Sequence, residues 1–315
     1  MANSMTKRAF LGMSHSPLYG LNPISTEVEE ALKAALDITR KRVQSFDPEL
    51  VILIAPDHYN GFFNELMPPF CIGAQAVSVG DYLTPAGPLN VAKNQALDLS
   101  RHLMDKDFDV AVSYQMEVDH GFSQALQFMW GDLDTPPVIP LFMNAVAEPT
   151  VPRIRRCRQL GLAIGEWIDT LGLRTLVIGS GGLSHEPPVP TLKHPDPAVR
   201  ERITVKNKPD AEQIQLKTQR VMAAGMALAN KEPSMKPLAP QWDLRWMDAI
   251  EAADLASLEK LTEVSITQDA GMSAHESKTW VIARAAARGA SITGVRHYQE
   301  IPELIAGYGI LFIHN

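Results

Sequence analysis

The sequence predicts an α/β fold in which a central, mostly buried sheet is flanked by helices within a single domain. Short, nearly continuous apolar runs are typical of strands that are covered on both faces. These runs alternate with longer segments of helical periodicity, which favours a layered α/β arrangement. The length of 315 residues, with 45% hydrophobic and 21% charged residues, suits a globular chain with a sizeable core. We expect one domain over residues 1–315.

Each predicted element follows from its local pattern. In the first helix, Thr26 and Glu29 have the spacing of a capping box, and Asp47 with Pro48 ends the helical pattern. The apolar runs predicted as strands are residues 9–13, 49–55, 110–114, 138–143, 176–178 and 310–313. The predicted helices are residues 27–46, 91–104, 159–171, 211–230 and 279–288.

Residues 186–240 interrupt this alternation. The segment begins with a stretch rich in proline and charge, then resumes a helical pattern, and contains a second proline-rich stretch at residues 232–240. Long connections of this kind are often functional. We interpret residues 186–240 as a surface excursion within the domain, serving as a lid or as an oligomer contact.

Composition excludes several classes of protein. The formal net charge is -7 and no basic stripe is present, so a nucleic-acid partner is not expected. Cys71 and Cys157 lie far apart, which argues against a disulfide framework or a cysteine zinc site and suits a reducing compartment. No apolar signal region and no membrane-spanning run of about 18 residues is evident, so we expect a cytoplasmic protein without a membrane partner.

Four of the nine histidines each follow a predicted strand. They are His15, His58, His120 and His185. Ligands of open α/β sheets bind outside the carboxyl ends of the strands. One histidine there is more often an ordinary hydrogen-bonding loop residue. Four histidines after four strands predict that the imidazoles meet at one site.

Whether a carboxylate is among the ligands determines which metal ion such a site could hold. Glu276 is a candidate ligand, but Ser273 three residues earlier also gives it the spacing of a helix capping box. The neighbouring His275 could support the site or replace Glu276 as a ligand. Histidines alone would indicate zinc, whereas two histidines with one carboxylate form the facial triad of non-haem Fe(II) oxygenases. Such a triad leaves room for a catecholate and for O2, and so brings two reactants together.

Six motifs together resemble the class III extradiol ring-cleavage dioxygenases, over a span from Leu11 to about Gly309. The motifs are SHSPL at 14–18, APDHYNGFF at 55–63, PPFCIG at 68–73, VDHGF at 118–122, GSGGLSH at 179–185 and AHESKTW at 274–280. The resemblance implies that His15, His58 and Glu276 hold Fe(II). It also implies that His120 and His185 carry out acid–base steps. We assign His185 to deprotonating the catechol and His120 to donating a proton, with the opposite assignment left open.

The resemblance also implies an activity, which is extradiol (meta) cleavage of a catechol by O2. The expected substrates are 2,3-dihydroxyphenylpropionate, giving 2-hydroxy-6-oxonona-2,4-dienedioate, and 2,3-dihydroxycinnamate. A homo-oligomer is expected. Arg245, Lys278 and Arg284 are candidates for binding the side-chain carboxylate of the substrate. The alternatives are a dioxygenase for another catechol, a zinc hydrolase, and a non-catalytic protein similar to the Memo proteins.

Overall fold

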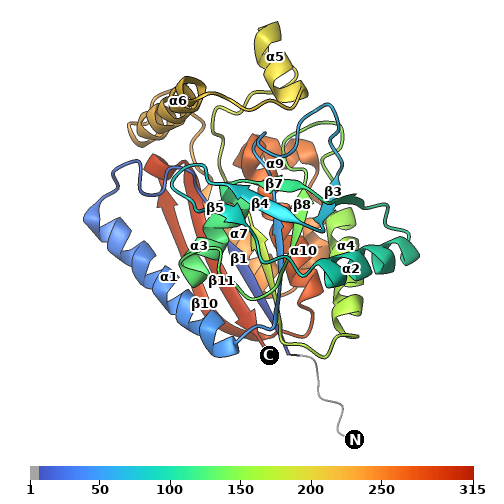
Figure 1. Ribbon diagram of the computed structural model, residues 1–315. Helices are drawn as coiled ribbons and strands as arrows, with labels where there is room; N and C mark the ends of the chain where they lie inside the picture. The colour runs from blue at the N-terminus through green and yellow to red at the C-terminus, as the bar shows by residue number, and fades with distance from the viewer. Residues whose placement is uncertain (1–6) are drawn as a thin grey trace, which may run out of the picture.

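The computed structural model describes residues 7–315, so residues 1–6 of the predicted domain lie outside the described residues. Its centre is an eight-stranded mixed sheet in the order β10-β11-β1-β9-β2-β8-β3-β6 (Figure 1). These strands are β1 (Arg8–Met13), β2 (Leu50–Ala55), β3 (Phe70–Gly73), β6 (Ala111–Ser113), β8 (Val138–Met143), β9 (Thr175–Ser180), β10 (Ile292–Ile301) and β11 (Ala306–His314). A smaller sheet has the order β5-β4-β7 and contains β4 (Ala76–Val79), β5 (Ala86–Pro88) and β7 (Met116–Val118).

The middle of the large sheet consists of four parallel strands, β1, β9, β2 and β8. Every residue of these strands is buried, which explains why their sequences are continuous apolar runs rather than alternating ones. Because the four strands are parallel, their carboxyl ends lie at the same edge of the sheet. The loops that follow them therefore converge there.

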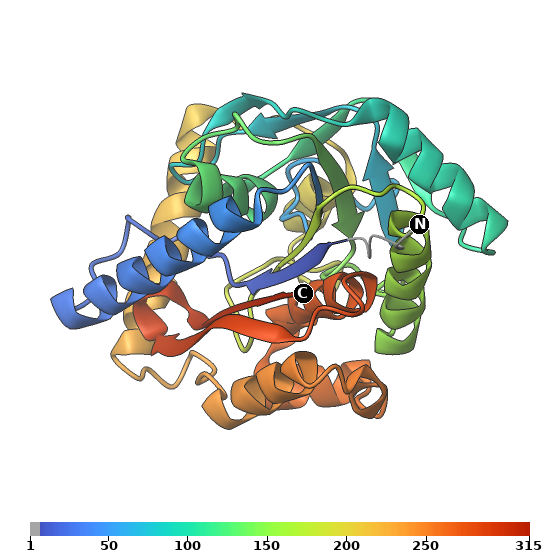
Figure 2. The ribbon, with the colours of Figure 1, turned by 90° about the horizontal axis from the view of Figure 1, so that it is seen from below.

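Helices cover both faces of this sheet, and the view along the strands shows the layers (Figure 2). α1 (Thr26–Phe46) and α3 (His120–Trp130) pack on one face. The other face is covered by α2 (Lys93–Asp105), α4 (Ile154–Ile168), α7 (Pro240–Glu251) and α10 (Lys278–Ala286). The short elements are α8 (Leu255–Leu258), α9 (Glu263–Ala270) and the 3-10 helices η1 (Met272–Ser277) and η2 (Pro302–Leu304). The predicted fold class is confirmed.

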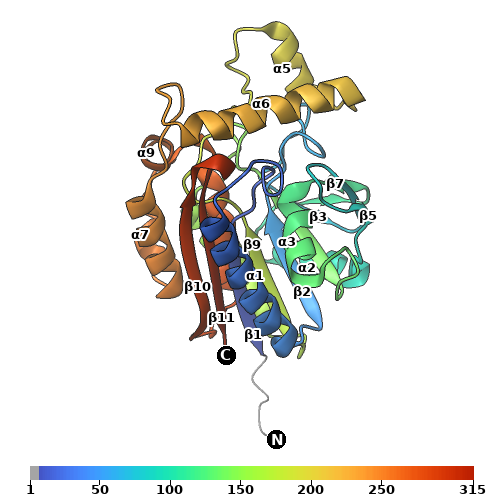
Figure 3. The same ribbon diagram turned by 90° about the vertical axis from the view of Figure 1, so that its left-hand side faces the viewer.

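The proline-rich excursion forms α5 (Pro197–Thr204) and α6 (Ala211–Ala229). α6 lies across the edge where the parallel strands end, and α5 stands beyond it (Figure 3). Asn22 fastens α6 to the body, because its Nδ2 donates to the carbonyl of Met222 at 3.0 Å and to that of Glu303 at 2.8 Å. The excursion therefore covers one edge of the sheet rather than extending freely into solvent.

Several predicted boundaries are wrong. The capping residue of α1 is Ser25, whose side chain accepts from the backbone N–H of Val28, and not Thr26. The helix predicted at 159–171 runs over Ile154–Ile168 instead. The strand predicted at 110–114 is shorter in the structure, where it is β6. The sequence analysis also missed five strands, because short or half-exposed strands lack a continuous apolar run. The missed strands are β3, β4, β5, β7 and β10. Within residues 7–315, no helix is long and apolar enough to cross a membrane.

Candidate active site

Three of the four predicted histidines follow the carboxyl ends of parallel strands, as expected. His15 comes after β1, His58 after β2 and His185 after β9. His120 differs, because it follows β7 of the small sheet and is the first residue of α3. The prediction that it directly follows the strand at 110–114 is therefore wrong, because β7 lies between that strand and His120. His120 nevertheless reaches the same place, where its ring stacks on that of His58 with centroids 4.3 Å apart.

Glu276 lies at the centre of these imidazoles. Its Oε2 is 3.4 Å from Nε2 of His15, and its Oε1 is 3.3 Å from Nε2 of both His58 and His185. The side chain is 1% exposed. The alternative role in a capping box is wrong, since Gly271 precedes η1 and the cap has no side-chain hydrogen bond. The carboxylate is therefore free to serve the site.

Hydrogen bonds set the tautomer of the buried His15. Ser180 Oγ donates to the carbonyl of Gly121 at 2.6 Å, so it accepts from Nδ1–H of His15 at 3.0 Å. The Nε2 lone pair then points toward Glu276. This Nε2 is buried and forms no hydrogen bond within the described part of the chain. Burial lowers the pKa of His15 to about 3, so the ring is neutral and its lone pair is available to a metal ion.

The other imidazoles are also held through Nδ1. Asp119 Oδ2 lies 3.0 Å from Nδ1 of His58, and Asp81 Oδ2 lies 2.6 Å from Nδ1 of His120. His185 donates from Nδ1 to the carbonyl of Leu183 at 2.9 Å. Each ring therefore turns its Nε2 toward the shared site, which is the usual way in which a metal-binding or catalytic histidine is oriented.

Two aspartates were not identified correctly from the sequence. Asp119 in the VDHGF motif has two interpretations from the sequence, an exposed loop carboxylate, which is favoured, or a residue that orients a neighbouring imidazole. The favoured interpretation is wrong, because Asp119 is fully buried and holds both the ring and the backbone N–H of His58. Asp81 was missed altogether. It binds the backbone N–H of His120 with Oδ1 at 2.8 Å and the ring with Oδ2. No local signal identifies it, because Asp81 lies 39 residues before the histidine that it orients.

The charges in the site favour an ionised carboxylate. Burial alone would raise the pKa of Glu276, but the facing imidazoles of His185, His58 and His15 outweigh burial and hold that pKa well below its usual range. Burial likewise lowers the pKa of His185, yet the Glu276 carboxylate more than compensates and raises it. A buried carboxylate that faces several imidazole nitrogens is a suitable environment for a divalent cation.

The described residues can hold such an ion. One ring nitrogen from each of His15, His58 and His120 lies within 4.8 Å of the others, and the unbonded Nε2 of His15 needs a partner. Imidazole nitrogens with one carboxylate suit iron, and imidazole alone would also suit zinc. His275 is not part of this group, because its Nε2 lies 3.0 Å from Thr267 Oγ1 and the ring lines a different cavity.

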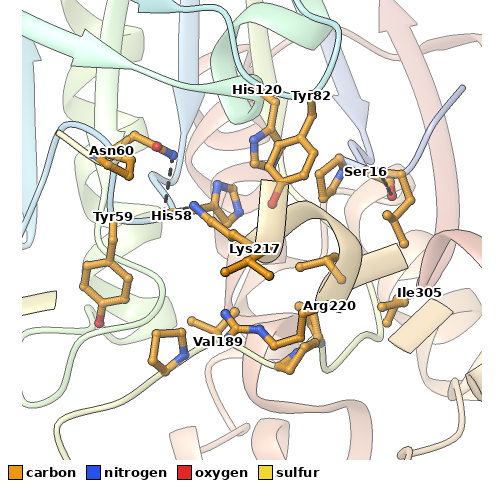
Figure 4. A pocket seen from close by; sticks show the side chains of 18 of the residues that line it. Ser16, His58, Tyr59, Asn60, Tyr82, His120, Val189, Lys217, Arg220 and Ile305 are labelled. Atoms are coloured by element: carbon orange, nitrogen blue, oxygen red, sulfur yellow. Dashed lines mark hydrogen bonds between the residues drawn. The ribbon is translucent and has the colours of Figure 1, made fainter. Parts of the chain in front are cut away.

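A cavity of about 450 Å³ opens above these residues, and the close view shows His58 and His120 among the side chains that line it (Figure 4). Residues of the excursion form one wall. None of the arginines and lysines predicted to bind a substrate carboxylate lines it, so that prediction is wrong. Lys278 and Arg284 are buried and donate to the carbonyls of Pro152 and Ile250. The cations that do line the cavity are Arg202, Lys217 and Arg220.

The family described as the catalytic LigB subunit of aromatic ring-opening dioxygenase matches residues 9–309. This match covers nearly all of the chain and every residue of the site. The chain belongs to this family. Membership in the LigB family confirms the predicted class of enzyme and agrees with a cluster that can bind a metal ion.

Curated relatives match this chain over almost all of its length. A 2,3-dihydroxyphenylpropionate/2,3-dihydroxicinnamic acid 1,2-dioxygenase of Comamonas testosteroni is 61% identical and covers 100% of this chain and 99% of its own length. Proteins of the same name from Burkholderia vietnamiensis and Paraburkholderia phymatum are 47% and 45% identical. The first covers 95% of both chains and the second 96% of both chains. The predicted resemblance is confirmed.

Proposed function

We propose that this LigB-family chain cleaves 2,3-dihydroxyphenylpropionate and 2,3-dihydroxycinnamate with O2 in an Fe(II)-dependent extradiol reaction. The bond beside the diol breaks and both oxygen atoms of O2 enter the product, which for the first substrate is 2-hydroxy-6-oxonona-2,4-dienedioate. The observation that carries the proposal is a buried, ionised Glu276 facing the Nε2 atoms of three imidazoles. The names of the full-length relatives support the choice of substrate.

His15, His58 and Glu276 are proposed to hold the iron. The facing Nε2 atoms and the carboxylate supply the two-histidine, one-carboxylate set that is typical of non-haem Fe(II) oxygenases. Held by these three residues, Fe(II) would supply open coordination positions for a catecholate and for O2 and a route for electron density between them. Asp119 and Ser180 orient the two histidines, so the ligands are positioned before the ion arrives.

The two remaining histidines are proposed to move protons. His185 accepts a catechol proton at Nε2, because its Nδ1 is held by the carbonyl of Leu183. His120 donates a proton from Nε2 as the O–O bond breaks. Its Nδ1 is bound to Asp81, which fixes the orientation of the ring. Both side chains line the cavity, so each can reach a bound substrate.

The test is oxygen consumption with 2,3-dihydroxyphenylpropionate by protein reconstituted anaerobically with Fe(II) or with Zn(II). We expect oxygen uptake and a yellow ring-opened product with Fe(II) alone. No uptake by iron-loaded protein with this or other catechols would overturn the proposal. Hydrolysis of an ester or amide by the zinc form would instead favour a metal-dependent hydrolase.

The remaining features of the proposal concern the whole chain. We propose that it forms one catalytic domain, that it assembles into a homo-oligomer and that it acts in the cytoplasm. Two buried free cysteines, Cys71 and Cys157, support a reducing compartment. Light scattering after size-exclusion chromatography tests the assembly, and a single subunit mass would contradict it.

A further inference from the structure

We propose that Lys217 and Arg220 of α6 form the subsite that binds the side-chain carboxylate of the substrate. This inference rests on the proposed function, because it concerns the part of the substrate that does not react. Both residues line the same cavity as His58, His120, His185 and Glu276. They belong to the excursion, at a position where the sequence offered no motif.

The two cations are placed together by the helix. Residues three apart lie on the same face of a helix, and this face of α6 borders the cavity (Figure 4). Nζ of Lys217 is 3.5 Å from the carbonyl oxygen of His58, which places the ammonium group beside a proposed iron ligand. A substrate with its diol at the iron could therefore extend a short side chain toward α6.

Neither cation has an anionic partner. Among residues 7–315, no carboxylate lies within 4.0 Å of Lys217 or Arg220, although several other lysines form ion pairs at that distance. Within the described part of the chain, Glu276 is the one acid that lines the cavity, and its oxygens already face three imidazoles and the backbone N–H of Gly182. A cavity wall with two uncompensated positive charges is complementary to an anion.

The rest of the wall suits the ring and the alkyl chain. Apolar side chains line the cavity from the body, the proline-rich stretch and α6. They include Leu18, Val189, Val199, Leu216, Val221 and Ile305. A catechol ring on an apolar surface, a diol at the histidines and a carboxylate at α6 would place each part of the molecule against groups of matching polarity.

The test compares 2,3-dihydroxyphenylpropionate with 3-propylcatechol, which replaces the carboxylate by a methyl group. For the iron-loaded Lys217→Met and Arg220→Met variants, we expect kcat/KM for the carboxylate substrate to fall about 10- to 100-fold each, since a hydrogen bond to a charged group contributes about 1.5–3 kcal/mol. The loss should appear mainly in KM. The kcat/KM for 3-propylcatechol should stay within about 2-fold of wild type, and Lys217→Arg should recover most of the loss.

A matched control is Lys208→Met, which removes an exposed lysine near α6 that does not line the cavity. It should leave both substrates unaffected. Equal losses on both substrates, or no loss in either Met variant, would overturn the subsite. A carboxylate-specific loss in Arg202→Met alone would assign the subsite to α5 and would also overturn it. If wild-type protein opens neither catechol, the proposed function itself fails, and this outcome is distinct from the others.

Discussion

Each imidazole at the site is oriented by one acceptor on its Nδ1. Substituting one acceptor should therefore affect only the step in which its own histidine takes part. Two acceptors are aspartates and the other two are a serine hydroxyl and a backbone carbonyl. The pairs are His15 with Ser180, His58 with Asp119, His120 with Asp81 and His185 with Leu183. The aspartates are the informative ones, because one supports a proposed iron ligand and the other a proposed proton donor.

Asp119→Asn should weaken iron binding. Asp119 Oδ2 accepts from both the ring and the backbone N–H of His58, while Oδ1 accepts from the backbone N–H of Gly121. An amide has only one oxygen, so Asn would turn its NH2 group toward one of these donors. Changes to such supporting groups typically cost about 10- to 100-fold in metal affinity. Competition with a chelator measures the affinity for Fe(II). Wild-type affinity in the variant would contradict this role of Asp119.

Asp81→Asn should instead lower kcat and leave iron binding unchanged. It loosens His120, which is not among the proposed iron ligands, so iron content and KM should stay near wild type. We expect kcat to fall about 10- to 100-fold, because general acid–base catalysis contributes about 10²–10⁴ and misorientation removes part of that. Steady-state kinetics of iron-saturated protein measures it. An iron affinity that falls as far as in Asp119→Asn would show that the two aspartates do not act separately.

At the scale of elements, close packing between loops places the side chains. Gly182, in the loop after β9, has no room for a side chain, because an added Cβ would lie 2.5 Å from Cε1 of the His185 ring. Its backbone N–H also donates to Glu276 Oε2 at 3.1 Å. The loop thus carries a proposed base and contacts a proposed ligand at the same time, which requires glycine at this position.

Gly182→Ala should therefore impair catalysis without unfolding the chain. The clashing atoms belong to the end of a side chain that can rotate, so the His185 ring should move away and kcat should fall about 10-fold or more. Gly161→Ala is the matched control, because its Cβ would lie 2.3 Å from the backbone oxygen of Ile282 where α4 packs on α10. We expect that variant to lose about 1–3 kcal/mol of stability instead. Thermal unfolding and kinetics of both variants measure the difference, and equal effects would contradict it.

At the scale of the whole molecule, the proposed iron ligands come from positions 15, 58 and 276 and meet only in the folded chain. An ion that binds the folded state and not the unfolded state stabilises the former by mass action. Metal binding should therefore be visible in the stability of the whole molecule as well as in activity.

Fe(II) should raise the melting temperature of the metal-free protein. At a free concentration 100-fold above Kd the expected gain is about 2.7 kcal/mol, which corresponds to a rise of about 5 °C for a chain of this size. Anaerobic differential scanning calorimetry measures the shift. Glu276→Gln should show a much smaller shift at the same iron concentration, and an undiminished shift in that variant would argue against Glu276 as a ligand.

Much of the architecture was predictable because it depends on local patterns. Continuous apolar runs identified β1, β2, β8 and β9, since strands buried on both faces need apolar residues at every position. The same reasoning placed His15, His58 and His185 at one edge of the sheet, because parallel strands end together. Short strands such as β4 and β7 escaped prediction, because their pairing depends on neighbours far along the chain.

What the sequence by itself determined was the α/β class, the family resemblance and four histidines and one glutamate that meet at the site. Only the tertiary structure showed that Glu276 forms no capping box and faces three imidazoles, because a capping box and a ligand have the same local spacing. It also assigned Asp81 to His120 and brought Lys217 and Arg220 over the cavity. These partners are separated by tens to hundreds of residues, and a contact across such a distance leaves no periodic signal in the chain.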